Sequence, residues 1–127
     1  NAVRSSVALG EVGGSGLIQN VILSFRDAVT GTFADIYYFG ASPTGSQCID
    51  NSNFALAEID RDKIIGVVHI SDFTSSTPVV IAQANNLAMP FAPSPAGTSI
   101  WACAVARSTF VITGIGYASL ITKILRQ

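Results

Sequence analysis

Residues 17–25 read LIQNVILSF, and this stretch decides the fold class. Polar Asn20 and Ser24 fall on one parity of the stretch, and several of its large apolar side chains fall on the other. The side chains expected to face a core are Leu17, Val21, Leu23 and Phe25. A period of two is typical of a β-strand with one buried face. The stretch therefore predicts a half-buried strand.

Further strands of this kind are expected along the chain. They cover residues 33–39, 64–70, 77–84, 99–107 and 118–126. Within 99–107, Trp101, Cys103 and Val105 share one face, and small alanines share the other. Val and Ile together number 25 against 7 Leu, which favours strands over helices. The helix we expect is limited to one or two turns at residues 50–56.

The connections between these segments indicate the architecture. Turn residues at 27–32 predict that the strands 17–25 and 33–39 form an antiparallel pair. Prolines at three positions place residues 85–98 in a rim loop or an irregular edge segment. Short strands, no repeat of fixed length and no βαβ spacing predict an all-β fold. We expect a single-domain antiparallel β-sandwich, jelly-roll-like, with an N-terminal arm.

Two regions are expected along the chain. Residues 1–16 end in Gly13-Gly14-Ser15-Gly16 and are interpreted as the N-terminal arm and a glycine joint. Residues 17–127 are interpreted as the β-sandwich domain.

The low charge content limits the classes of partner that we expect for the chain. Charged residues make up 12% of the 127 residues and the formal net charge is −1, whereas roughly 25% charged residues is usual. Clustered Lys and Arg are missing from the sequence, which argues against nucleic-acid binding. The longest apolar run, residues 100–106, is far shorter than the ~20 residues of a spanning helix, so no membrane insertion is expected. A surface this poor in charge predicts burial in an oligomer or assembly.

Cys48 and Cys103 are the two cysteines. Their separation fits neither a zinc site nor a redox CxxC motif. The sequence favours two small buried thiols, while a disulfide and a reactive thiol stay open as alternatives.

The candidate catalytic residues are His69 with its neighbours Ser71 and Asp72. Adjacent strand residues alternate between faces, and no GxSxG turn is present, so a Ser-His-Asp hydrolase is not expected. A Cys-His nucleophile lacks any local signature. We expect instead that the histidine is hydrogen-bonded at a sheet margin, and that the chain has no catalytic residues.

Neither a metal site nor a glycan-binding surface is expected. Asp60, Asp62 and Asp50 carry oxygens that a hard cation prefers, but Arg61 and Lys63 interleave with them, so we expect a solvated turn with local ion pairs and no metal or other cofactor. A glycan-binding surface would need exposed aromatic rings. The aromatic candidates are Trp101, Tyr37, Tyr38 and Tyr117, and we expect Trp101 to lie in the core.

The order of segments resembles that of small β-domain virion proteins of tailed bacteriophages, of the capsid decoration or cement type. The segments that carry the resemblance are 16–23 (GLIQNVIL), 35–39 (DIYYF), 50–56 (DNSNFAL) followed by Asp60, 64–70 (IIGVVHI), 99–105 (SIWACAV) and a terminal strand at 120–125.

The resemblance implies a structural protein of the capsid exterior, commonly a homotrimer, that clamps neighbouring subunits of the major capsid protein. It also suggests that the arm reaches a neighbour through Arg4, Val7 and Leu9. A tail, collar or fibre-associated module and a carbohydrate-binding β-sandwich are the alternatives, and an enzyme is the class least supported by the sequence.

Overall fold

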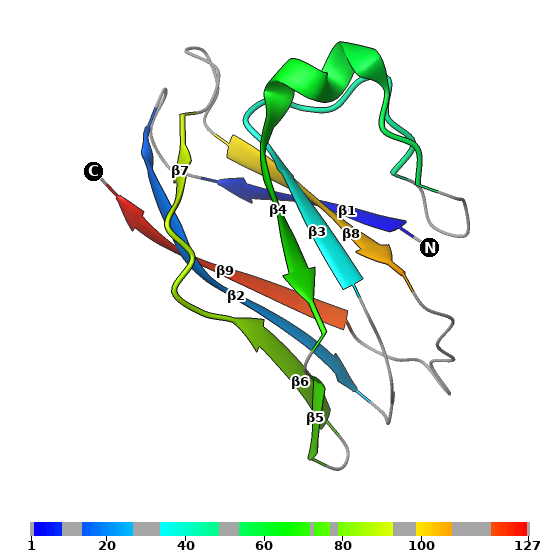
Figure 1. Ribbon diagram of the computed structural model, residues 1–127, viewed down its shortest axis with the longest axis vertical. Helices are drawn as coiled ribbons and strands as arrows, with labels where there is room; N and C mark the ends of the chain where they lie inside the picture. Colours follow the sequence, from blue (N-terminus) through cyan, green and yellow to red (C-terminus); the bar gives the residue numbers. More distant parts are fainter. Residues whose placement is uncertain are drawn as a thin grey trace.

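The computed structural model describes residues 2–8, 14–26, 34–48, 54–71, 73–76, 79–92, 99–107 and 118–126. The elements in these ranges are β1 (Ala2–Ala8), β2 (Gly16–Arg26), β3 (Ala34–Phe39), the 3₁₀ helix η1 (Glu58–Lys63), β4 (Ile64–Ile70), β5 (Phe73–Ser76), β6 (Val79–Ala84), β7 (Met89–Phe91), β8 (Ser99–Ala106) and β9 (Ala118–Arg126). The strands form two antiparallel sheets that pack face to face (Figure 1). The predicted all-β sandwich is confirmed. No helix in the described part of the chain is long and apolar enough to cross a membrane.

The first sheet has the order β1-β8-β3-β4. The second sheet is centred on β2, which pairs with β9 along one side and with β6 and β7 along the other, while β5 lies beyond β6. The expected antiparallel pair of 17–25 with 33–39 is therefore wrong, because β2 and β3 lie in different sheets. Periodicity identifies the buried face of each strand, and consecutive strands here bury those faces against each other across the sandwich.

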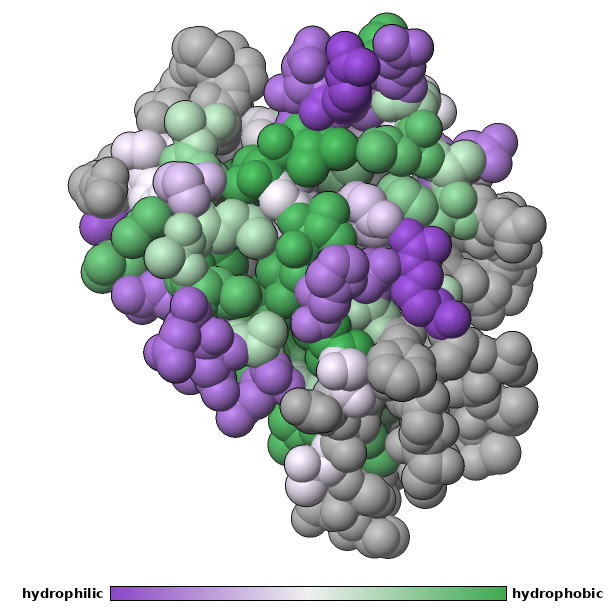
Figure 2. All heavy atoms as spheres, viewed as in Figure 1, coloured by the Kyte–Doolittle hydropathy of each residue, from purple (hydrophilic) through white to green (hydrophobic). Residues whose placement is uncertain are grey.

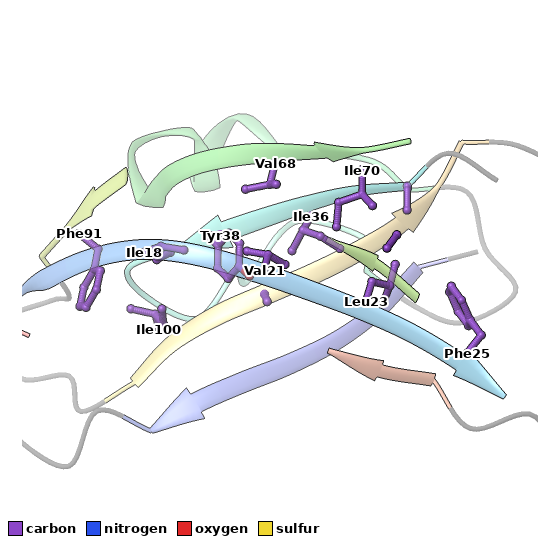
Figure 3. Close-up of a cluster of buried hydrophobic side chains, with 13 residues drawn as sticks. Ile18, Val21, Leu23, Phe25, Ile36, Tyr38, Val68, Ile70, Phe91 and Ile100 are labelled. Atoms are coloured by element: carbon purple, nitrogen blue, oxygen red, sulfur yellow. The ribbon is translucent and has the colours of Figure 1, made fainter. Parts of the chain in front are cut away.

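The main core fills the space between the sheets (Figure 3). Ile18 and Val21 of β2 face Ile36 and Tyr38 of β3 and Ile100 of β8, and all five side chains are fully buried. The Tyr38 hydroxyl reaches through this core to the hydroxyl of Thr122 on β9, at 2.7 Å. Burial of these aliphatic groups contributes roughly 1.5–3 kcal/mol per side chain to folding.

A β-bulge changes which residues of β2 face the core. Ile18 pairs with Ile124 of β9 and Asn20 pairs with Lys123, so Gln19 is an additional residue on β2. The Gln19 carbonyl accepts a hydrogen bond of 2.8 Å from the Leu87 N–H, which satisfies the backbone at the bulge. An extra residue reverses the alternation of side chains on one side of the bulge.

As a result, the core-facing position predicted for Leu17 belongs to its neighbour. Ile18 is fully buried, while Leu17 is half-buried on the outer face of the second sheet, opposite Leu125. Val21, Leu23 and Phe25 are buried, as the alternation predicted.

The N-terminal segment interpreted as an arm contains a strand of the sandwich. Residues Ala2–Ala8 form β1, which pairs with β8 along its whole length. Of the residues suggested as interface positions, Arg4 lies opposite Cys103 and Val7 opposite Ile100, and Leu9 lies outside the described residues. Gly16 begins β2, and a side chain there would collide with the Leu125 carbonyl oxygen of β9. This glycine allows the close approach of the two strands.

Candidate functional site

The outer face of the first sheet carries a second, smaller core. Phe39, Cys103 and Val105 are its buried residues, and half-buried Trp101 and Phe54 pack against it. The predicted sharing of one face by Trp101, Cys103 and Val105 is confirmed. Alternate residues of β8 thus serve two different cores.

A disulfide between Cys48 and Cys103 links the segment that follows β3 to β8, with the two Cα atoms 6.2 Å apart. The interpretation favoured from the sequence, two buried thiols, is wrong, and the disulfide left open as an alternative is present. The signal was invisible in the sequence because the two residues are 55 positions apart and meet only once β8 lies beside β3.

Asp60 of η1 organises the connection between β3 and β4, and its side chain is fully buried. Its carboxylate accepts hydrogen bonds from the backbone N–H groups of Thr44, Gly45 and Ser46 at 3.0, 2.9 and 2.6 Å. It also accepts one from the Ser46 hydroxyl at 2.7 Å and forms an ion pair with the Lys63 ammonium at 2.7 Å. Burial alone would raise the pKa of Asp60, but these donors outweigh it and hold the pKa far below its usual range.

The environment of Asp60 differs from the solvated turn predicted from the sequence. Asp60 lies in a buried site and not in a solvated turn, because its carboxylate oxygens accept hydrogen bonds from the backbone N–H groups of residues 44–46. Asp62 is almost fully exposed and makes the expected local ion pair with Arg61, at 3.9 Å. Asp50 lies outside the described residues, and those residues contain no group of three potential metal ligands. Residues 50–53 of the helical turn expected at 50–56 lie outside the described residues, 54–56 are not helical, and a 3₁₀ helix forms at Glu58–Lys63.

A polar cluster lies on the exposed side of the first sheet, and Asp35 is at its centre. Asp35 of β3 lies directly opposite His69 of β4, and its Oδ1 is 2.5 Å from His69 Nδ1. Arg107, just after β8, donates from Nε to the other Asp35 oxygen at 2.7 Å. The same guanidinium donates to the Tyr37 hydroxyl at 2.6 Å and lies over the Tyr37 ring, 5.8 Å from its centroid. Burial would raise the pKa of Asp35, but Arg107 and His69 together lower it.

The Asp35 cluster joins three neighbouring strands of one sheet. The expected hydrogen-bonded histidine at a sheet margin is confirmed, since β4 is the last strand of its sheet and the His69 side chain is 78% exposed. Cross-strand pairing also builds a polar cluster around His69, which the residues of its own strand do not provide. The carboxylate partner of His69 is Asp35 on the neighbouring strand, and Asp72 lies outside the described residues. Both cysteines are held in the disulfide, so neither is a thiol nucleophile.

Three of the four aromatic candidates for a glycan surface lie in the described residues, and they do not share one exposed surface. Tyr38 is fully buried in the main core, whereas Tyr37 and Trp101 belong to the outer side of the first sheet. The Tyr37 ring stacks on Phe54 with the centroids 4.5 Å apart. Tyr117 lies outside the described residues.

The outer face of the second sheet exposes large aliphatic side chains. Ile121 and Leu125 of β9 are 48% and 50% exposed, and Ile81 and Val79 of β6 are 42% and 36% exposed. Cross-strand neighbours extend these groups over β2, where Ile22 lies opposite Ile121. Nothing in the sequence marked this face, because the alternation of β6 and β9 does not say which apolar residues remain outside.

A second exposed apolar group lies on the connection before β4. Ile59 of η1 is 70% exposed and Leu56, just before η1, is 42% exposed. The surrounding side chains are charged. Glu58 and Asp62 flank Arg61, and hydrophilic atoms gather over η1 at the top of Figure 2.

Comparison of the chain with protein-family models, with curated proteins and with solved structures gave no match.

Proposed function

We propose that this protein is a structural module of a virion, which binds the major capsid shell as an oligomer and stabilises it as a decoration or cement protein. The observation that carries the proposal is the exposed aliphatic face of the second sheet, defined by Val79, Ile81, Ile121 and Leu125. Large aliphatic groups exposed on one face of a sheet are a candidate protein interaction surface. The virion setting comes from the order of segments in the sequence.

The energetics of this face suit a repeated, individually weak contact. Ile121 and Leu125 are about half exposed, so burying the remainder of each contributes about 1 kcal/mol. A ligand that binds only the assembled shell stabilises that shell by mass action, and linked copies add their contacts through avidity. A module of this kind works without a reaction or a cofactor.

The rigidity of the domain supports the same role. Two sheets, a disulfide and the buried Asp60 site fix the surfaces before binding. A preorganised surface loses less conformational entropy when it binds. A clamp between capsid subunits needs this property, because it must resist strain at many equivalent positions.

The test is sedimentation of the purified protein with undecorated phage heads. The wild type is expected to pellet with the heads, and Ile121→Glu is expected to remain in the supernatant because it places a charge in the apolar face. Ser71→Glu is the matched control, since Ser71 is exposed at the end of β4 on the first sheet.

Three results would contradict the proposal. They are a wild type that ignores heads, binding of Ile121→Glu equal to wild type, and equal loss of binding in both variants. Binding to isolated tails in place of heads would favour the tail, collar or fibre-associated module.

A further inference from the structure

We propose that copies of this chain associate head to tail, with the η1 region of one copy seated on β9 of the next. The η1 ridge consists of Leu56, Glu58, Ile59 and Asp62. The β9 stripe consists of Ile121, Lys123 and Leu125. This inference rests on the proposed function and names the surfaces through which the oligomer forms, which leaves Val79 and Ile81 of β6 on the same face for the shell.

Both surfaces offer large exposed aliphatic groups of matching character. Ile59 is the most exposed large hydrophobic residue among the described ones, at 70%, and it lies on a short helix at the end of the first sheet. On the β9 stripe, Ile121 and Leu125 lie on the outer side of the strand, at alternate positions with Lys123 between them. In the proposed contact, the Ile59 side chain of one copy packs against Ile121 and Leu125 of the next copy.

The charges around the aliphatic groups have opposite signs on the two surfaces. Exposed Glu58, Arg61 and Asp62 give the η1 region a net charge of −1, from two acidic and one basic side chains. Exposed Lys123 gives the β9 stripe a charge of +1. Complementary charges favour pairing of the two different surfaces and oppose pairing of identical ones.

The placement of the two surfaces determines the kind of assembly. η1 connects β3 to β4 of the first sheet, while β9 pairs with β2 in the second sheet, and Figure 1 shows η1 and β9 apart from each other. One copy therefore keeps both surfaces available for different neighbours. Contact between two different surfaces generates a ring if the rotation closes, and a filament if it does not.

The test uses two complementary variants at exposed positions. The ridge variant carries Glu58→Lys with Ile59→Ser, and the stripe variant carries Ile121→Ser with Lys123→Glu. Each alone is expected to show the monomer mass of 13.2 kDa by light scattering, under conditions where the wild type is a multiple of it. Mixed in equal amounts, they are expected to form a dimer of twice that mass, because the intact stripe of one meets the intact ridge of the other. Thermal unfolding of each variant verifies that it is folded.

The outcomes separate this inference from the proposed function. A ridge variant that keeps the wild-type mass, or two monomeric variants that fail to combine, would overturn head-to-tail association. Wild-type sedimentation with phage heads would still support the proposed function in that case. A dimer in the mixture together with wild type that ignores heads would support the inference and contradict the virion role.

Discussion

Asp60→Asn should destabilise the protein more than any other substitution of a charged residue in the η1 segment. An amide keeps the size of the side chain but removes the charge, and it presents an NH₂ group to donors that need an acceptor. Two of the N–H groups, those of Gly45 and Ser46, share one carboxylate oxygen, and the Lys63 ammonium loses its ion pair. Hydrogen bonds to a charged group contribute about 1.5–3 kcal/mol each, and removing one partner of a buried ion pair costs about 3–5 kcal/mol. We expect the free energy of unfolding to fall by about 3–5 kcal/mol.

The buried Asp60 carboxylate should also make the stability of the protein depend on pH. The folded-state pKa of Asp60 lies far below the ordinary carboxyl value of 3.8. A depressed folded pKa contributes stability that is fully present above the unfolded pKa and is lost as pH falls toward the folded value. The difference in stability between wild type and Asp60→Asn should therefore be largest near neutral pH and narrow below about pH 4.

The assay is urea unfolding with the disulfide intact, analysed for both the midpoint and the slope. Asp62→Asn is the control, because Asp62 is 96% exposed on the same helix and should change stability by less than about 0.5 kcal/mol. A loss below about 1 kcal/mol for Asp60→Asn, or a loss equal to that of the control, would refute the assigned role of the buried carboxylate.

Three further predictions concern the scaffold. Replacing Cys48 and Cys103 by serine should lower the free energy of unfolding by about 4 kcal/mol, since the disulfide closes a loop across 55 positions; an unchanged denaturation midpoint would contradict this. Tyr38→Phe should cost about 1 kcal/mol, because the Tyr38 hydroxyl bonds to the half-buried Thr122 hydroxyl at 2.7 Å, and spectrophotometric titration of the wild type should show that burial raises the pKa of Tyr38 to about 12. Gly16→Ala should lower the melting temperature, since the added methyl group meets a backbone oxygen of β9.

Faces of strands were predictable from the sequence where the alternation is uninterrupted. In β8 the side chains of Trp101, Cys103 and Val105 point away from Ile100 and Ala102, as the pattern required. This works because the geometry of an extended chain alone sets the direction of successive side chains. At the β2 bulge the same rule failed by one residue, because an extra residue in a strand is decided by its pairing partners.

Partners of strands and side chains were not predictable, because they depend on tertiary contacts. The sequence between 26 and 34 suggested a hairpin, yet β2 and β3 pair in separate sheets. Asp35 and His69 are 34 positions apart, and Asp60 binds backbone donors at 44–46, so neither site has a local signature. The Asp35 site forms only when β3 and β4 pair, and the Asp60 site forms only when the connection between β3 and β4 folds back on itself.

The exposed apolar residues were also predictable only in part. A low charged fraction predicted a partner for the surface, but it could not say which surface. The structure shows exposed aliphatic groups on β6, β9 and η1.

Light scattering of the wild type and of Ile121→Glu across a concentration series tests the central claim, that this domain assembles through the outer face of its second sheet. We predict that the wild type has a mass that is a multiple of 13.2 kDa, and that Ile121→Glu is folded and monomeric. A wild type that stays at 13.2 kDa at every concentration, or a variant whose mass equals that of the wild-type oligomer, would contradict it.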